Sequence, residues 1–304
     1  MADDAIADQT ETISIARLDL WREIQGNPPE IIYHYTNVEG LVGIISSGAL
    51  WATDLRFVND ATELDHALES MLSAVGRARE RFSSPAQLML LDRLAAVIAN
   101  KEGFPSVHSV SFSANGDLLS QWRAYGGSGR GYAIGFATSD LLPDFGYGIP
   151  AGGGSIHRVI YDSAAQDNLL VGVIALGCEL IEGINSAGGE IEPVAEGLVR
   201  RLLSGSESGL FYCLKAEGWA EEAEWRTIYA LPADESVPIE FRTVGGIPVP
   251  YLALEDNRKG LPIRKVVLGP STPAEIAETA VTSLLSHYGY PEVQIQRSRL
   301  PLRW

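Results

Sequence analysis

The chain is poor in cysteine, histidine and basic residues, and each shortage excludes a class of protein. Its two cysteines, Cys178 and Cys213, have no metal-site spacing and are too few for a disulfide framework. Its five histidines are scattered without pairing, so the sequence predicts no metal site. Only 23 Lys and Arg residues stand against 39 Asp and Glu residues, and the net charge is −16. This charge argues against a broad nucleic-acid surface but leaves room for a local basic pocket.

Other familiar signals are missing as well. We find no apolar run long enough to span a bilayer, and the acidic start at Met1–Asp4 lacks the basic and apolar regions of a signal peptide. We therefore expect a cytoplasmic protein without a membrane partner. No Gly-x-Ser-x-Gly elbow indicates a serine hydrolase. The glycine-rich stretch at 126–131 follows a predicted helix and precedes a predicted strand, which is the wrong context for a dinucleotide-binding loop, and it is not a Walker A loop either.

What the sequence does contain is an ordinary globular composition, with 46% hydrophobic and 20% charged residues over 304 positions. Predicted strands are scattered among pairs of predicted helices without strict alternation, which favours an α+β fold over a doubly wound sheet. We expect an N-terminal tail and short helix over residues 1–28 and a single α+β domain over 29–304. Helical insertions are expected at about 60–103 and 163–217, the second with a third helix at 206–217. A predicted strand at 249–254 contains Pro250, which indicates an edge strand.

The most informative segment is Glu222-Ala223-Glu224-Trp225-Arg226, which opens a predicted strand over 222–230. Alternation places Glu222, Glu224 and Arg226 on one face of that strand. Two carboxylates and a guanidinium are costly to bury without partners, so this face is either a solvated strand edge with an ion pair or part of a polar site. We expect Arg226 to pair with an acid or to bind a ligand phosphate.

A second polar cluster, His34-Tyr35-Thr36, ends a predicted strand just before a helix over 38–47 that stops at Gly48. His34 is either a partly buried core residue or a ligand-binding residue that lines one pocket with Glu224. Thr36 or Asn37 can cap the helix.

Three further sets have both a structural and a functional interpretation. Asp60 and Glu63 fit a capping box, which leaves Asn59 free for a ligand. Ser109, Ser111 and Ser113 share one face of a predicted strand over 106–113, where they form either an ordinary half-polar strand or the lining of a groove. Trp122 and Tyr125 share a helix face, either as core or as a stacking platform.

The ordered set of these motifs resembles a bacterial family catalogued as domain of unknown function (DUF) 2971. The residues that carry the resemblance run in this order: His34-Tyr35-Thr36, Asn59-Asp60, Ser111-Phe112-Ser113, Trp122 with Tyr125, Gly135-Phe136, Lys215, Trp219, Glu222-Ala223-Glu224-Trp225-Arg226, Leu268-Gly269-Pro270 and Arg297-Ser298. The likeness extends from about Tyr33 to Pro301 and supplies no activity.

A more distant likeness is to ADP-ribosyltransferase-type folds. The strand-borne His34 before the Leu41–Leu50 helix, the Ser-x-Ser strand at 111–113 and the Glu-x-Glu strand at 222–224 are similar to that superfamily. The resemblance implies a bent, split β-core with NAD as substrate. It makes Glu224 the catalytic acid that bonds a ribose hydroxyl, and Glu222 the group that orients or deprotonates the acceptor. His34, in the place of the superfamily's arginine, would bind the adenosine-side ribose, and Tyr125 or Phe112 would stack on nicotinamide.

On this resemblance we expect an NAD-using ADP-ribosyltransferase-like enzyme, a bacterial toxin or phage-defence effector, with an unknown acceptor and no metal. The alternatives are a non-catalytic nucleotide- or ligand-binding sensor and a metal-independent nuclease or hydrolase. The expected catalytic residues are Glu224, Glu222 and His34. The expected nucleotide-binding residues are His34, Tyr35, Thr36, Asn59, Ser111, Ser113, Trp122, Tyr125 and Arg226.

Overall fold

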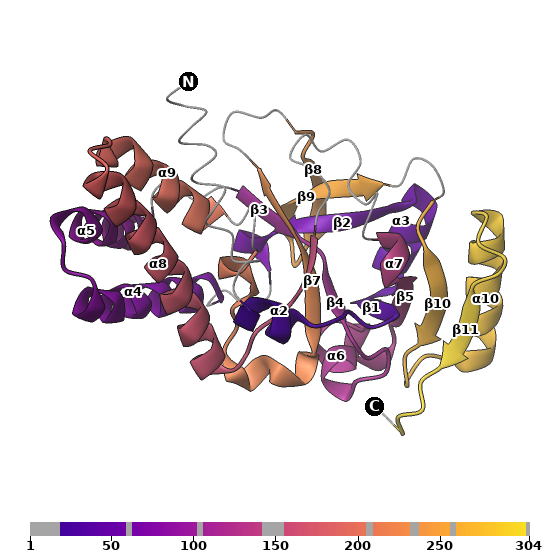
Figure 1. Cartoon of the computed structure of the whole chain (residues 1–304). Coiled ribbons are helices and arrows are strands. Elements are labelled where there is room, and N and C mark those ends of the chain that lie inside the picture. Colours follow the sequence, from indigo (N-terminus) through magenta and orange to yellow (C-terminus); the bar gives the residue numbers. More distant parts are fainter. Residues whose placement is uncertain are drawn as a thin grey trace.

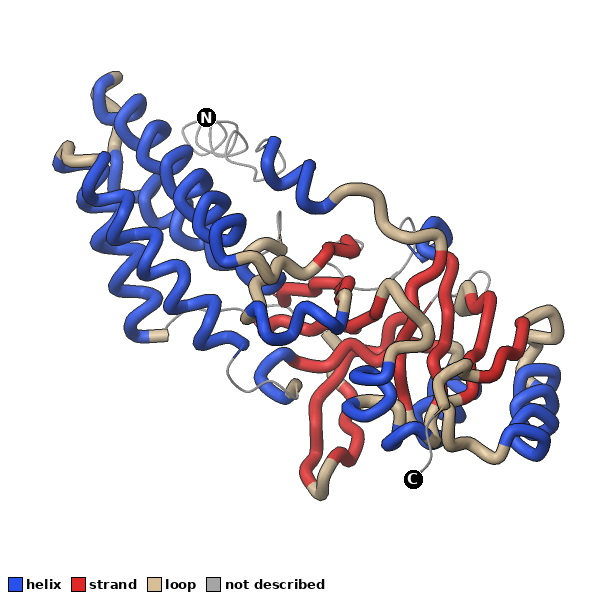
Figure 2. The backbone as a smooth tube through the Cα atoms, turned by 90° about the horizontal axis from the view of Figure 1, so that it is seen from below, coloured by secondary structure: helices blue, strands red, loops and turns tan. Residues whose placement is uncertain are grey.

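A bundle of long helices lies on one side of a large sheet, and the C-terminal helix lies on the other (Figure 1; Figure 2). The structure is a computed structural model that describes residues 19–58, 63–101, 106–141, 155–204, 209–231, 237–255 and 260–301. The expected N-terminal tail lies outside these residues, and of the short helix the described part is α2 (Asp19–Gln25).

The sheet is mostly antiparallel. Its strands are β1 (Ile31–Thr36), β2 (Ala49–Asp54), β3 (Ser106–Ser109), β4 (Ser111–Ser113), β5 (Tyr132–Ala137), β6 (Ser155–Arg158), β7 (Glu224–Leu231), β8 (Glu240–Val244), β9 (Ile247–Glu255), β10 (Ile263–Leu268) and β11 (Gln294–Arg297). They run in the order β11-β10-β5-β1-β4-β7-β3-β2-β9-β8, and β6 also pairs with β7. The pairing of β10 with β11 is parallel and the other described pairings are antiparallel. The expected mixture of helices and strands is therefore confirmed.

The sheet divides at the segment 106–113, which was expected as one strand and is present as β3 and β4. One edge of this segment follows β7 in a single register, from His108 opposite Tyr229 to Ser111 opposite Arg226. The other edge changes partner, because β2 pairs with Ser109 and β1 pairs with Ser113. On this edge, the backbone between Ser109 and Ser113 therefore faces the gap where β1 and β2 diverge.

Four helices form the bundle, and they come from two separate parts of the chain: α4 (Glu63–Arg81), α5 (Pro85–Asn100), α8 (Ser163–Ser186) and α9 (Ile191–Ser204). The start of α5 shows why the chain becomes helical here, since Ser84 and Gln87 form a capping box and Pro85 occupies the first turn. The helix then buries Leu90, Leu91, Leu94 and Ile98, each worth about 1.5–3 kcal/mol of hydrophobic stabilisation.

One of these helices contradicts an expectation. Helix α8 is long and apolar enough to cross a bilayer, whereas the sequence was read as having no such run. Its apolar side chains are accounted for by packing, because α8 contacts α4, α5 and α9 and buries Leu169, Leu170 and Ile181 in the bundle core.

Shorter helices border the sheet: α3 (Val38–Ser47), α6 (Leu119–Ala124), α7 (Thr138–Leu141) and α10 (Ala274–His287), with 3₁₀ turns η2 (Leu55–Phe57), η3 (Gly127–Gly129), η4 (Phe211–Cys213) and η5 (Glu217–Glu222). Helix α3 has the predicted bounds. Asn37 caps it by accepting from the Gly40 N–H, and Gly48 ends it in the left-handed region at φ 66°.

Three local predictions were wrong. The described part of 206–217 forms the short turns η4 and η5 and not a third helix. Strand β9, with Pro250, is paired with β2 on one side and β8 on the other, so the edge strand is β8. Strand β7 begins at Glu224, because Ala223 takes a left-handed conformation at φ 46°; Glu222 therefore belongs to η5 and not to the strand face.

Candidate functional site

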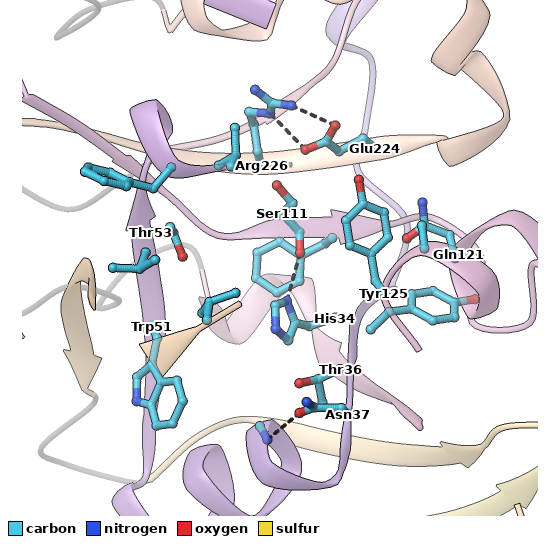
Figure 3. Close-up of a pocket in the computed structure, with 18 of the residues that line it drawn as sticks. His34, Thr36, Asn37, Trp51, Thr53, Ser111, Gln121, Tyr125, Glu224 and Arg226 are labelled. Atoms are coloured by element: carbon cyan, nitrogen blue, oxygen red, sulfur yellow. Dashed lines mark hydrogen bonds and ion pairs between the residues drawn. The ribbon is translucent and has the colours of Figure 1, made fainter. Parts of the chain in front are cut away.

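A pocket of about 700 Å³ lies where β1 and β2 diverge. In Figure 3, His34, Thr36 and Asn37 border it on one side and Glu224 and Arg226 on the opposite side, with Ser111 between them. Trp51 and Thr53 of β2 and Tyr125, which directly follows α6, close the two remaining sides. The pocket is large enough for a nucleotide-sized ligand.

The His34 side chain bonds a backbone carbonyl at the point where the sheet divides. The Ser111 carbonyl faces the gap between β1 and β2, and Nδ1 of the His34 ring lies 2.9 Å from that oxygen. Because a carbonyl can only accept, Nδ1 carries the proton and Nε2 is left as an acceptor. Desolvation lowers the pKa of His34 to about 4, with a smaller lowering effect from Arg242, and these outweigh the raising effect of the Ser111 bond. The imidazole is therefore neutral at pH 7.

The opposite wall is a buried group of five charged side chains, which we call the ion cluster: Glu63, Lys215, Glu222, Glu224 and Arg226. All five line the pocket. They come from α4, from the segment before η5, from η5 and from β7. Tertiary packing thus assembles groups that are up to 163 positions apart.

Arg226 is the centre of the ion cluster. It forms a fork on Glu224, with Nε 3.0 Å from Oε1 and Nη2 2.7 Å from Oε2. Nη1 donates to Glu63 and, at 2.9 Å, to the Tyr212 carbonyl. The expectation that Arg226 pairs with an acid is confirmed, and its engaged guanidinium leaves no fork for a ligand phosphate.

Lys215 and Tyr125 hold the second carboxylate. Lys215 Nζ is 2.5 Å from Glu222 Oε2 and 3.2 Å from Glu224 Oε2, and it lies over the Trp219 ring at 5.1 Å. The Tyr125 hydroxyl donates to Glu222 Oε1 at 3.0 Å. Glu222, although it is not on the strand, is therefore fixed in the same wall as Glu224.

The charges of the ion cluster do not balance. Three carboxylates face one ammonium and one guanidinium, which gives a net charge of −1 when all five groups are ionised. Desolvation raises the pKa of Glu224, but Arg226 and Lys215 outweigh it and lower that pKa to about 2. Glu224 is therefore a carboxylate at any physiological pH, and the wall carries an excess of negative charge.

The structure brings most of the predicted site residues together. The pocket is lined by His34, Tyr35, Thr36, Ser111, Tyr125, Glu222, Glu224 and Arg226, and His34 and Glu224 share it as predicted. The Tyr35 ring also packs on Trp122, with centroids 4.8 Å apart. Asn59 lies outside the described residues.

Two predicted residues support the pocket and do not line it. Trp122 is fully buried, and its Nε1 donates to Asp117 at 2.8 Å, so it is core and not a stacking platform. The Ser113 hydroxyl is buried and donates to the Glu222 carbonyl at 2.8 Å, which helps to fix the turn before β7.

Other pocket residues were missed. Glu63 was assigned to a capping box, but its carboxylate bonds Arg226, and nothing in the sequence connects two residues so far apart. Lys215 is among the residues that carry the family resemblance, but the sequence did not predict that it lines the pocket. Trp51 of β2 was not singled out, and Arg242 was missed because β8 was not predicted. No group of three or more His, Cys, Asp or Glu residues in the described ranges is arranged to hold a metal ion.

Comparison with known proteins gives one match. The model of a family described as "Protein of unknown function (DUF2971)" matches residues 121–227, a shorter span than the likeness seen from Tyr33 to Pro301. No curated protein and no solved structure matches the chain. The matched span begins at Gln121 in α6 and ends at Thr227 in β7, so it includes Tyr125, Lys215, Glu222, Glu224 and Arg226. Residues 121–227 are therefore similar to the DUF2971 family.

Proposed function

We propose that the pocket binds NAD and that the protein is an ADP-ribosyltransferase-like enzyme. The observation that carries the proposal is the excess negative charge of the ion cluster in the wall of a nucleotide-sized pocket. A carboxylate buried with an incomplete set of cations favours a ligand that brings positive charge. The nicotinamide ring of NAD is such a group.

The same charge is suited to breaking the bond between the ribose and nicotinamide. When that C–N bond breaks, its electron pair leaves with neutral nicotinamide and positive charge develops on the ribose. A preorganised carboxylate stabilises that charge most when it is ionised and shielded from water. Glu224 meets both conditions, since its pKa is about 2 and its side chain is 6% exposed.

The remaining roles follow from the contacts. The neutral His34 presents Nε2 as an acceptor for a ribose hydroxyl, with its ring fixed by the Ser111 carbonyl. Glu222 lies beside Glu224 through their common partner Lys215, where it can orient an acceptor. The Tyr125 ring, held by its hydroxyl on Glu222, offers a stacking surface for nicotinamide.

One observation favours a second candidate, a sensor that binds a nucleotide without cleaving it. Both oxygens of Glu224 are already engaged, Oε1 by Arg226 and Oε2 by Arg226 and Lys215. A carboxylate so fully bonded can serve as a rigid part of a binding wall, since a ribose hydroxyl must share an oxygen that has other donors.

The test is NAD consumption by the purified chain, with protein and nucleic-acid acceptors supplied in a panel. Glu224→Gln keeps the shape but removes the charge, and loss of such an electrostatic stabiliser typically lowers the rate ~10²–10³-fold. Glu222→Gln should reduce transfer to an acceptor more than hydrolysis. The matched control is Glu221→Gln, which changes an exposed neighbour outside the pocket and should leave turnover unchanged.

The outcomes separate the candidates. Turnover lost in Glu224→Gln, with an unchanged melting temperature, supports the enzyme. NAD binding without turnover supports the sensor. A wild-type chain that neither binds nor consumes NAD would defeat the proposal, and cleavage of the nucleic acid in the panel would favour a metal-independent nuclease.

A further inference from the structure

Arg242 of β8 is a pocket residue with no carboxylate partner among the described residues. It lines the same pocket as His34 and the ion cluster, and it contacts Trp51 and Thr53. The chain has 39 acidic and 23 basic residues, so carboxylates that could pair with a half-buried arginine are plentiful. Other pocket cations are paired, since Lys215 and Arg226 both contact glutamates.

The guanidinium is nevertheless held in a definite position. Its Nη2 donates to the Thr53 hydroxyl at 2.6 Å. It lies 5.5 Å from the centroid of the Trp51 ring and 5.9 Å from that of Tyr251, and these two rings pack together at 5.2 Å. The aromatic pair supports the planar cation. Thr53 engages one nitrogen only, and Nε is buried without any hydrogen-bond partner.

Without a bound anion, the Arg242 guanidinium destabilises the folded protein. Desolvation lowers the pKa of Arg242, and no carboxylate opposes that effect. A buried donor left without an acceptor destabilises the folded state, and such groups call for an explanation in a native structure. An oxyanion placed against the guanidinium would supply the missing negative charge. Guanidinium groups recognise phosphate through paired hydrogen bonds, which suits a fixed planar fork.

We propose that Arg242, held by Thr53 and the Trp51–Tyr251 pair, is the anion-binding group of the pocket and takes a phosphate group of the bound nucleotide. The pocket then has two ends of opposite charge, the ion cluster for a cationic or hydroxyl-bearing part and Arg242 for the phosphate. This inference rests on the nucleotide pocket of the proposed function but not on NAD cleavage.

The experiment measures what the phosphate adds to affinity. Isothermal titration gives Kd for adenosine, AMP, ADP-ribose and inorganic pyrophosphate with the wild-type chain, Arg242→Gln and Arg242→Lys. A charge-assisted hydrogen bond to phosphate should make AMP bind about 10–100-fold more tightly than adenosine. Arg242→Gln should bring this ratio close to 1, and Arg242→Lys should keep part of it because the charge remains without the fork.

Arg264→Gln is the matched control, since Arg264 lies outside the pocket and pairs on the surface with Asp140; the AMP-to-adenosine ratio should stay at the wild-type value. Thr53→Val tests the same idea if Arg242→Gln does not fold, because it releases Nη2 without removing the cation, and the ratio should fall.

The inference is overturned if AMP and adenosine bind the wild-type chain equally, if the ratio survives in Arg242→Gln, or if none of the four probes binds. Its failure is distinct from failure of the proposed function. NAD turnover with no phosphate preference would refute only the role of Arg242. Phosphate-dependent binding without NAD turnover would support Arg242 and refute the transferase.

Discussion

Removal of Arg226 should destabilise the protein far more than removal of its partner Glu63, although both belong to one buried contact. Arg226→Gln leaves Glu63 and Glu224 facing each other with Lys215 as the remaining cation, and the net charge of the ion cluster changes from −1 to −2. In the wild type, the Arg226 guanidinium donates to both glutamates and to the Tyr212 carbonyl, and the variant loses all of these bonds. Breaking a buried pair in this way costs about 3–5 kcal/mol.

Glu63→Gln acts in the opposite direction on the charge. It brings the ion cluster to neutrality and leaves the fork between Arg226 and Glu224 intact. The loss of a charge-assisted hydrogen bond, about 1.5–3 kcal/mol, is offset by relief of the excess negative charge. We expect a net cost of about 0–2 kcal/mol. Against a total stability of about 5–15 kcal/mol, the difference between the two variants is measurable.

Urea unfolding at pH 7 and pH 4, followed by tryptophan fluorescence, tests this reasoning. In the wild type the low pKa of Glu224 contributes stability that is complete above about pH 4.5 and is lost as the pH falls toward 2. In Arg226→Gln, desolvation dominates and raises that pKa, so its penalty is present at pH 7 and shrinks as the carboxylate is protonated. The variant's deficit should therefore be smaller at pH 4. Equal costs for the two variants, or a deficit that grows on acidification, would refute the argument.

Two further predictions concern the other walls of the pocket. Desolvation, helped by Arg242, lowers the pKa of His34 to about 4, so ligand binding should stay constant from pH 8 to 5 and fall only near pH 4. The stability that neutral His34 provides is complete above about pH 6.5, and it is lost as the pH falls from 6.5 to 4. An acid limb of binding near pH 6.5 would show that the ring titrates normally. Gly43→Ala should weaken binding and destabilise the fold by about 1–3 kcal/mol, since the new Cβ would lie 2.3 Å from the Trp51 ring. Gly76→Ala, in open space on α4, is the control and should stabilise by about 0.5–1 kcal/mol; equal melting temperatures for the two variants would contradict the claim.

Local signals in the sequence predicted the elements that local interactions determine. Helix α3 has the expected bounds because a cap and a terminator, Asn37 and Gly48, act within a few residues. His34 and Glu224 were placed correctly because a polar residue on a buried strand is conspicuous by its neighbours. Arg226 was expected to find an acid, since an unpaired buried guanidinium is costly.

Features that depend on distant partners could not be predicted in the same way. Glu63 fits a capping box by sequence, and only the fold places it against Arg226. The alternation from Glu222 to Arg226 is interrupted by the left-handed Ala223, a residue type that gives no warning of positive φ. Arg242 stands on a short strand with exposed neighbours, so no burial pattern marks it.

The position of the two helix pairs in the chain has a consequence for how the protein folds. Val110 and Thr227 meet across the segment that carries the pocket, yet they are 117 positions apart, and contacts of such long range form slowly. Helices α4 and α5 directly precede β3, and α8 and α9 precede β7. Docking of these local, fast-forming pairs brings the two strands together and shortens the chain that must be closed. We expect the bundle to set the rate at which the pocket forms. A large-to-small substitution that leaves a cavity between α5 and α8 changes no pocket residue, and it should delay the recovery of ligand binding during refolding.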